Sequence, residues 1–277
     1  SLHNWATLSL QNLVSVGTNL KYYIERGGAY NDITPIRLTT AAGDVTFAAV
    51  NGDATLTVTD AAHGAVINDF VTFSAAASLG GNITAAVLNQ EYQIATIVNG
   101  NSYTIEAKDT SGSTVLANGS DTGNGGSNTV GTYQINTGNE IEVPFTGWGA
   151  GTWGQSTWGN GGITLAGMRL WSQANFGEDL FFIHRNGALY YWDASSGVTT
   201  RGVLVSSLGG AAQVPTVANI AFVSDIFRFA FCFGANAIGS STLDPMLLRW
   251  SDQEDIADWN PTSVNQAGSL SLSEGTE

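Results

Sequence analysis

The chain has 277 residues, which is enough for one large β domain or for two smaller domains. Only 12% of its residues are charged and 34 are glycine, so the long charged side chains that favour helices are scarce. The formal net charge of −14 argues against a nucleic-acid-binding protein, because such a protein needs basic residues to neutralise phosphates. We therefore expect an all-β protein whose acidity serves solubility or repels a polyanion.

The first predicted structural unit is a set of hairpin-linked strands in residues 13–33. An apolar strand is followed by a tight turn at Gly17-Thr-Asn19, an aromatic strand and a second turn at Gly27-Gly28, and Trp5 precedes the unit. Short strands joined by Gly or Asn turns are typical of antiparallel hairpins. We assign residues 1–43 to the first part of a propeller-like domain.

Residues 44–136 differ in character, because they contain eight acidic residues against one basic residue, Lys108, and no tryptophan. Alternating apolar and polar residues predict strands with one buried and one wet face. The predicted strands are 55–59, 70–73, 92–98 and 102–106, with a hairpin turn at Asn99-Gly100 between the last two. We expect a small inserted β-sandwich or barrel domain, with a flexible loop at 117–128 near its exit.

Three tryptophans, Trp148, Trp153 and Trp158, follow in a glycine-rich segment. Their spacing of five residues matches neither the strand nor the helix period, so their rings cannot share one face of a regular element. They are expected either to pack into crevices between blades or to form an exposed patch. An exposed patch would bind a partner subunit or stack on sugars.

Residues 137–277 repeat the hairpin pattern of the first unit. Residues 180–193 pair two strands across the turn Arg185-Asn-Gly187 and end in Tyr191-Trp-Asp193, and a looser copy at 214–259 contains Arg249-Trp-Ser-Asp252. Hairpin-linked strands that end in Trp-Asp suggest blades of a β-propeller, in which the aromatic ring fills the space between adjacent sheets and the Asp caps the turn. Three copies predict a partial β-propeller-like domain, interrupted by the insert and incomplete within this chain.

Two expectations concern the chain as a whole. It starts without Met and stops at Gly275-Thr-Glu277 without a closing signal, so we expect a fragment of a longer polypeptide. The longest apolar region, 217–238, is interrupted by Ser224, Asp225 and Arg228, so no membrane-spanning helix is expected.

Residue types that often carry catalysis or bind metals are few and scattered. Cys232 is the single cysteine and lies in an apolar run, which predicts a buried thiol. His63 is expected in a turn, and His184 at an exposed hairpin tip. The acidic cluster 252–258 could bind calcium but lacks the spacing of a calcium loop, so a solvated turn is expected. We therefore predict no catalytic residue, no metal or cofactor site and no enzyme activity.

Several short segments resemble the tail nozzle (tail tubular) proteins of short-tailed bacteriophages, and together they cover most of the chain. In the insert the resemblance lies in residues 59–64, 68–73, 88–92 and 101–104, where Asn68 and Gln90 replace the glycines of most relatives. Outside the insert it lies in Asp32-Ile-Thr-Pro-Ile-Arg37, Arg169-Leu-Trp-Ser172, Asn175-Phe-Gly-Glu-Asp-Leu180, Leu248-Arg-Trp-Ser-Asp-Gln-Glu-Asp255 and Trp259-Asn-Pro-Thr262.

This resemblance implies a structural protein of the phage tail within the virion, assembled in the host cytoplasm. Six copies would form a ring around the DNA exit channel, between portal-side adaptor proteins and tail-tip or fibre proteins. An acidic channel wall would let genomic DNA pass without specific binding. Ring formation needs head-to-tail contacts, so opposite faces of each subunit must be complementary.

Two other classes of function stay open. A carbohydrate-binding phage or host-surface adhesin would stack Trp148, Trp153 or Trp158 on glycans, and Trp-dependent binding on a glycan array would favour it. A glycan-degrading enzyme would need two carboxylates that meet only in the fold. Release of reducing ends that is lost on carboxylate substitution would favour the enzyme.

Overall fold

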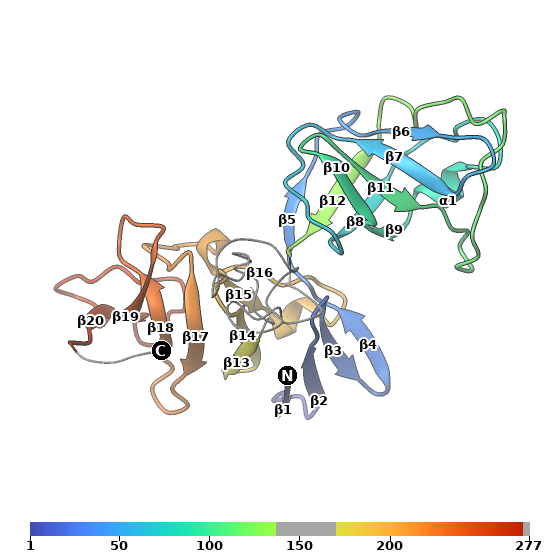
Figure 1. The fold of residues 1–277 in the computed structure, drawn as a ribbon. Coiled ribbons are helices and arrows are strands. Elements are labelled where there is room, and N and C mark those ends of the chain that lie inside the picture. Colours follow the sequence, from blue (N-terminus) through green and yellow to red (C-terminus); the bar gives the residue numbers. More distant parts are fainter. Residues whose placement is uncertain (137–169, 274–277) are drawn as a thin grey trace, which may run out of the picture. The chain divides into compact units, whose positions relative to one another are not determined.

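The computed structural model describes residues 1–136 and 170–273, which form an all-β protein with one single-turn helix, α1 (Ala85–Leu88). The strands in these residues make five four-stranded antiparallel sheets, none of which closes into a barrel (Figure 1). The prediction of an all-β, propeller-like fold is confirmed. In the same residues, no helix is long and apolar enough to cross a membrane.

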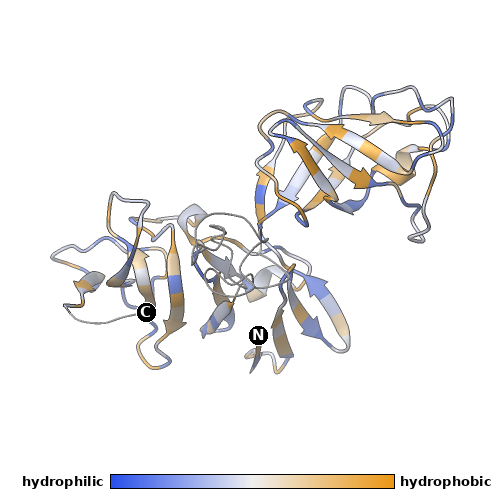
Figure 2. Cartoon of the chain, in the orientation of Figure 1, coloured by the Kyte–Doolittle hydropathy of each residue, from blue (hydrophilic) through white to orange (hydrophobic). Residues whose placement is uncertain are grey.

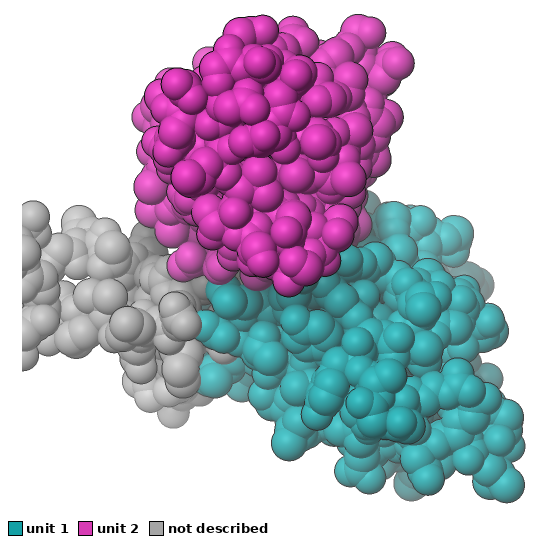
Figure 3. Space-filling view, turned by 90° about the vertical axis from the view of Figure 1, so that its right-hand side faces the viewer, with its two compact units in different colours: residues 1–35, 137–277 teal, residues 36–136 magenta. Residues whose placement is uncertain are grey.

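The chain divides into two compact units (Figure 3). Unit 1 contains Ser1–Pro35 and Thr137–Glu277, and unit 2 contains Ile36–Asn136. Unit 2 begins before residue 44, the start taken from composition, because β5 (Ile36–Thr39) pairs with β12 (Val130–Gln134) in a sheet of this unit. The acidic residues that mark the insert in the sequence begin only at Asp44, after β5 has ended.

The described part of unit 1 contains three four-stranded sheets, which we name blades 1, 2 and 3. Each blade contains one of the predicted hairpin copies, and its four strands follow one another in chain order. Blade 1 consists of β1 (Leu2–Ala6), β2 (Asn12–Gly17), β3 (Tyr22–Arg26) and β4 (Ala29–Asp32). Blade 2 consists of β13 (Trp171–Phe176), β14 (Asp179–His184), β15 (Leu189–Trp192) and β16 (Val203–Leu204), with short 3₁₀ turns η1 (Ala194–Ser196) and η2 (Val205–Ser207). Blade 3 consists of β17 (Ala218–Val223), β18 (Ala230–Asn236), β19 (Leu243–Trp250) and β20 (Gly268–Ser271).

Blades 1 and 2 pack against each other through aromatic rings. Tyr22 of blade 1 stacks on Phe182 of blade 2 with 4.4 Å between the ring centroids, and its hydroxyl donates a hydrogen bond to Gln173. Trp192 of blade 2 is buried and meets Trp5 of blade 1 edge to face at 6.3 Å. The prediction that the aromatic residue of Tyr191-Trp-Asp193 fills the space between sheets is therefore confirmed for Trp192.

Blade 3 presents small side chains to the other face of blade 2. Phe181 and Ile183 of blade 2 belong to the same buried cluster as Ala221, Ala230 and Cys232 of blade 3. Large side chains on one sheet fill the space left by small ones on the next, which gives the dense packing of a protein interior. Cys232 is fully buried, as predicted, and burial raises the pKa of its thiol.

The acidic residues at the ends of blades 2 and 3 cap turns, as predicted. Asp193 accepts a hydrogen bond from the Ser195 N–H at 2.8 Å, where η1 begins. Asp252 accepts hydrogen bonds from the Gln253 and Gln266 N–H groups at 2.8 and 2.7 Å. The tryptophan of the second motif differs from the prediction, because Trp250 is only partly buried and lies on the face of blade 3 turned away from blade 2.

Unit 2 consists of two four-stranded sheets that enclose one apolar core. One sheet has the order β10-β11-β7-β6 and the other β5-β12-β8-β9. Their further strands are β6 (Thr46–Ala49), β7 (Thr55–Thr59), β8 (Phe70–Ser74), β9 (Glu91–Gln93), β10 (Thr96–Asn99) and β11 (Ser102–Glu106). Apolar and polar residues alternate along these strands (Figure 2), and the apolar set from both sheets, including Leu56, Phe73 and Tyr103, is buried between them. The arrangement is that of a β-sandwich.

The strand predicted at 92–98 is two strands, β9 and β10, in different sheets. β9 pairs with β8, whereas β10 pairs with β11. The chain crosses between the sheets at Ile94 and Ala95, where the Ile94 N–H donates to the Asp69 carbonyl and the Ala95 N–H to the Thr104 carbonyl. The alternating pattern continues through the crossing because Ile94 is buried in the shared core, so the sequence shows no break.

Asp121 holds the loop 117–128, which the sequence predicts to be flexible. The loop contains no strand, but the buried carboxylate of Asp121 accepts hydrogen bonds from the backbone N–H groups of Gly81 and Ile83 at 2.8 and 2.9 Å. It also accepts from Asn82 and Asn118 at 3.0 and 2.8 Å. The middle of the loop is therefore fastened to the segment that precedes α1.

Asn68 adopts a left-handed backbone with φ of 74°. Asparagine tolerates this conformation better than most residues, and glycine adopts it without cost. We expect Asn68→Ala to lower the free energy of unfolding by about 1 kcal/mol and Asn68→Gly to leave it within about 0.5 kcal/mol. Denaturant unfolding followed by circular dichroism measures both values. Equal losses in the two variants would contradict the backbone explanation.

Candidate interaction surface

The first hairpin of each blade in unit 1 turns at the same edge, which we name the hairpin edge (Figure 1). It consists of the turns 7–11 in blade 1, 177–178 in blade 2 and 224–229 in blade 3. The Trp5 indole donates a hydrogen bond to the Glu178 carbonyl at 3.0 Å. A Cβ atom added to Gly177 would lie 3.8 Å from Nη1 of Arg228. The three turns are therefore neighbours and form one continuous edge.

Large apolar side chains stand exposed on this edge. Leu8, Leu10, Ile226 and Phe227 are 56–89% exposed, and none of them belongs to a buried cluster of the described residues. Burying one such side chain contributes about 2 kcal/mol. Apolar side chains gathered on one surface are typical of a site that binds another molecule.

The backbone of the hairpin edge is also unusual. Leu10 and Arg228 both have a left-handed backbone, with φ of 60° and 49°. A residue other than glycine, asparagine or aspartate in this conformation costs about 1 kcal/mol. A turn selected only for folding would have glycine or asparagine at Leu10. Leu10 therefore presents an exposed apolar side chain on a backbone that glycine or asparagine would adopt at lower cost.

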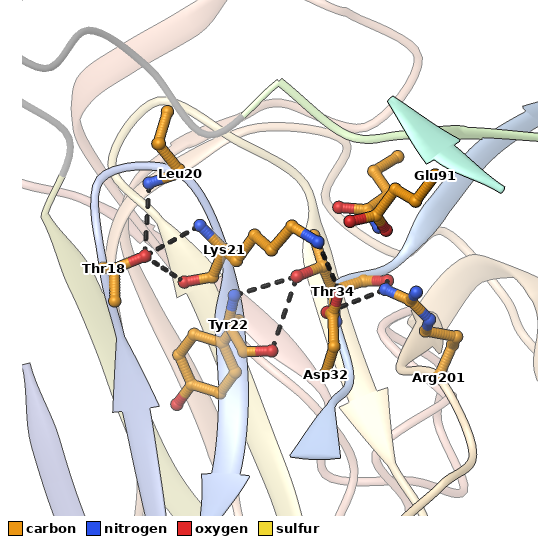
Figure 4. A network of polar contacts seen from close by, with 9 residues as sticks. Thr18, Leu20, Lys21, Tyr22, Asp32, Thr34, Glu91 and Arg201 are labelled. Carbon is orange, nitrogen blue, oxygen red and sulfur yellow. Dashed lines mark hydrogen bonds and ion pairs between the residues drawn. The ribbon is translucent and has the colours of Figure 1, made fainter. Parts of the chain in front are cut away.

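A polar network around Asp32 fastens blade 1 to the segment between β15 and β16 (Figure 4). The Asp32 carboxylate accepts from Lys21 Nζ at 2.9 Å and from the Thr34 N–H at 2.9 Å, and it lies 2.7 Å from Arg201 Nη1. Arg201 also donates to the Thr34 carbonyl at 3.1 Å. Burial alone would raise the pKa of Asp32, but hydrogen bonds from Thr34 and Lys21 and the charges of Lys21 and Arg201 hold it below its usual value. These groups are all engaged with one another, so the network stabilises the fold.

The three tryptophans predicted as partner or glycan contacts, Trp148, Trp153 and Trp158, lie outside the described residues. Their role stays a prediction.

The two histidines discussed from the sequence are both buried. His63 lies in the predicted turn, where its Nδ1 accepts from the Ala65 N–H at 3.0 Å and its Nε2 lies 3.0 Å from the Asn99 carbonyl oxygen. The prediction that His184 is exposed is wrong. Its ring folds over Gly187, where an added Cβ atom would come within 1.6 Å of the ring. The glycine that makes the tight turn also leaves the space for the imidazole.

The acidic cluster 252–258 uses its carboxylates for local turns. Asp255 accepts from the Ala257 N–H at 2.9 Å and Asp258 from the Asn260 N–H at 3.0 Å, in addition to the cap made by Asp252. Residues 1–136 and 170–273 contain no group of three or more His, Cys, Asp or Glu side chains placed to hold a metal ion.

A polar groove of about 490 Å³ on unit 2 is lined by residues 68, 90–95, 106 and 108–112. Gln90 lies in this lining, and its amide donates to the Lys108 carbonyl at 2.5 Å and to the Val87 carbonyl at 2.8 Å. Tyr92 also donates, to the Val87 carbonyl at 2.5 Å. Gln90 and Tyr92 thus hold α1 and the loop after β11 in place, so their polar groups are not free to orient a ligand.

Comparison with known proteins finds no family model that matches the sequence and no curated protein that matches it significantly. Among solved structures, the chain is similar to the endosialidase of phage phi92, with 12% sequence identity and a TM-score of 0.25. The alignment covers 99% of this chain and 38% of that chain, so the chain spans well under half of the other protein's length. Values this low establish neither a shared family nor a shared activity.

Proposed function

We propose that this protein is a structural, non-enzymatic component of a bacteriophage tail, a ring subunit of the tail tube or nozzle that surrounds the DNA exit channel. The observation that carries the proposal is the hairpin edge, where four exposed apolar side chains lie on adjacent turns. The resemblance of segments such as Asp32–Arg37 and Asn175–Leu180 to nozzle proteins supplies the biological setting.

The way in which the protein uses its polar side chains supports a structural role. Asp32 and Asp121 hold loops through hydrogen bonds to the protein's own backbone and side chains. In unit 2 the buried Tyr133 hydroxyl donates to Asp60 at 2.6 Å and lies 2.8 Å from the Tyr103 hydroxyl. Burial raises the pKa of both tyrosines, so they stay protonated and act as fixed hydrogen-bonding groups. Such networks specify a rigid shape, which a subunit of a particle requires.

The proposed partners follow from this setting. They are further copies of the chain in a ring, which the resemblance implies to be a hexamer, together with portal-side adaptor proteins and tail-tip or fibre proteins of the virion. Genomic DNA would pass through the ring without specific binding, which the net charge of −14 favours because like charges repel.

Removing the apolar side chain at Leu10 is expected to weaken assembly without weakening the fold. Leu10→Gly deletes a side chain that is 86% exposed and relieves the left-handed backbone at φ of 60°. If a neighbouring subunit buries this leucine, the loss of about 2 kcal/mol weakens each contact about 30-fold. Sedimentation velocity over a range of concentrations measures the association, and thermal unfolding measures the fold.

Val264→Ser is the matched control, because Val264 is as exposed as Leu10 but lies outside the hairpin edge. It should leave the association unchanged. A wild-type chain that stays monomeric at every concentration, or a Leu10→Gly chain that associates like wild type, would count against the proposed assembly surface.

A further inference from the structure

Two adjacent cross-strand rows on the side of blade 3 turned away from blade 2 carry only apolar side chains, and we name these rows the outer face of blade 3. Cross-strand pairing places Ile220, Phe233, Leu248 and Leu270 in one row and Phe222, Phe231 and Trp250 in the next. Four of these side chains (Ile220, Phe222, Phe233 and Leu270) are 37–55% exposed. A sheet face with seven apolar residues and no charge is typical of a buried layer.

The rings on this face are already ordered against one another. Phe222 stacks on Phe231 with 5.0 Å between the centroids and on Phe233 with 5.6 Å, and Phe231 lies 6.4 Å from Trp250. Trp250 lies flat over Gly268, where an added Cβ atom would come within 2.3 Å of the indole. The result is a continuous aromatic layer over the four strands.

On its two middle strands, the outer face of blade 3 repeats the cross-strand pairs of the face of blade 2 that blade 3 covers. Blade 2 pairs Phe181 with Tyr191, and blade 3 pairs Phe231 with Trp250 at the equivalent place. The adjacent row pairs Ile183 with Leu189 in blade 2 and Phe233 with Leu248 in blade 3. The turn-capping Asp193 and Asp252 follow two residues after Tyr191 and Trp250.

The cover on the blade 2 face shows what fits such a surface. Blade 3 covers it with a sheet whose facing side chains include the small Ala221, Ala230 and Cys232. A glycan site would place polar groups beside the rings, and a site for anionic lipid would carry basic residues. Neither kind of residue occurs in the two rows of the outer face.

We propose that the outer face of blade 3 is an interface for a further four-stranded antiparallel sheet that presents small side chains to it. This inference does not rest on the proposed role in a phage tail. It agrees with the architecture of propellers, which close with about four to eight blades, whereas the described part of unit 1 has three. Trp250 would then fill the space between blade 3 and the added sheet, as Trp192 fills the space between blades 1 and 2.

The reactivity of an added thiol on this face tests the proposal. The native Cys232 is fully buried, so Ile220→Cys supplies the accessible thiol for reaction with Ellman's reagent. A second copy of residues 214–273 joined to the end of the chain by a glycine-serine linker supplies a sheet with the small-residue face. The fusion should slow the reaction of the thiol at position 220 at least about tenfold, because reaction then requires the sheets to separate.

The matched control is the same fusion with Ala221→Glu and Ala230→Glu in the added copy alone, which should react as fast as the unfused chain. Equal reaction rates of the thiol at position 220 in the two fusions would overturn the proposal. A fusion whose far-UV circular dichroism shows no more β-sheet than that of the unfused chain would overturn it too. If the thiol at position 220 of the unfused chain reacts more slowly as the protein concentration rises, the face binds a second copy of the chain instead. Protection by phosphatidylcholine vesicles would assign it to a membrane.

Discussion

Replacing Asp121 by Asn is expected to lower the free energy of unfolding of unit 2 by about 2–4 kcal/mol. The carboxylate accepts four backbone N–H bonds at 2.8–3.0 Å, and it is buried. An amide in the same place turns an NH₂ group toward two of these donors, so two buried N–H groups lose their acceptor. The substitution keeps the size of the side chain, so the loss reports the hydrogen bonds.

The effect should also depend on pH. Burial alone would raise the pKa of Asp121, but the four N–H groups hold it below its usual value. A carboxyl group with a lowered folded-state pKa contributes its full stability above the unfolded-state pKa of about 3.9 and loses it as the pH falls through the folded-state value. The difference between wild type and Asp121→Asn should therefore be largest near neutral pH and shrink below about pH 4.

Far-UV circular dichroism follows the unfolding of both units, because both consist of β-sheet, and tryptophan fluorescence follows unit 1 alone. A transition seen by circular dichroism but not by fluorescence is therefore that of unit 2. All eight tryptophans lie in the residues assigned to unit 1, and Ile36–Asn136 has none. Asp109→Asn is the control, because this carboxylate also accepts N–H bonds within its own turn but is only partly buried. The explanation would be contradicted if Asp109→Asn lowered the free energy of unfolding of unit 2 as much as Asp121→Asn does. It would also be contradicted if the difference in this free energy between wild type and Asp121→Asn were the same at pH 3 as at neutral pH.

Phe182→Ala is expected to lower the free energy of unfolding of unit 1 by about 3–5 kcal/mol. Phe182 is fully buried between blades 1 and 2, where it lies 4.4 Å from the Tyr22 ring and 5.6 Å from the Tyr190 ring. Gly202 also packs against it, since an added Cβ atom there would come within 2.7 Å of the Phe182 ring. With contacts on three sides, the site cannot collapse to fill the cavity.

In this variant the midpoint of the unfolding transition followed by tryptophan fluorescence should fall. The midpoint of the unit 2 transition should stay unchanged, because the two units have separate apolar clusters. Phe222→Ala makes the same chemical change on the exposed outer face of blade 3 and should cost less than about 1 kcal/mol. Equal losses in Phe182→Ala and Phe222→Ala would show that the blades do not pack as described.

The blades could be predicted from the sequence because their determinants are local. Turns such as Arg185-Asn-Gly187 join strands that are adjacent in the chain, and each blade uses its strands in chain order. The crossing at Ile94 was missed because it depends on pairing with strands far away in the chain. Alternation alone does not show which sheet a strand joins.

Arg249 shows another limit of the sequence. An arginine beside Trp250 and Asp252 suggests a surface position, yet Arg249 is buried. Its guanidinium donates to the carbonyl groups of Asn236, Gln213 and Trp259 at 2.5–3.3 Å. These carbonyls come from separate segments of the chain and converge only in the fold.

The hairpin edge was only partly visible in the sequence. Leu8 and Leu10 are apolar residues in a turn, where polar residues and glycine are usual. The same is true of Ile226 and Phe227. That the two pairs belong to one edge follows only from the packing of the blades, since more than 200 residues separate them in the chain.

The proposal that a phage encodes this protein and uses it in its tail is tested most directly by cryo-electron microscopy of purified phage particles. The account predicts that units 1 and 2 fit density in a ring that surrounds the DNA channel below the portal, with the hairpin edge buried against a neighbouring protein. Density for the chain in the capsid shell, or its absence from particles and presence in soluble host extract, would contradict it.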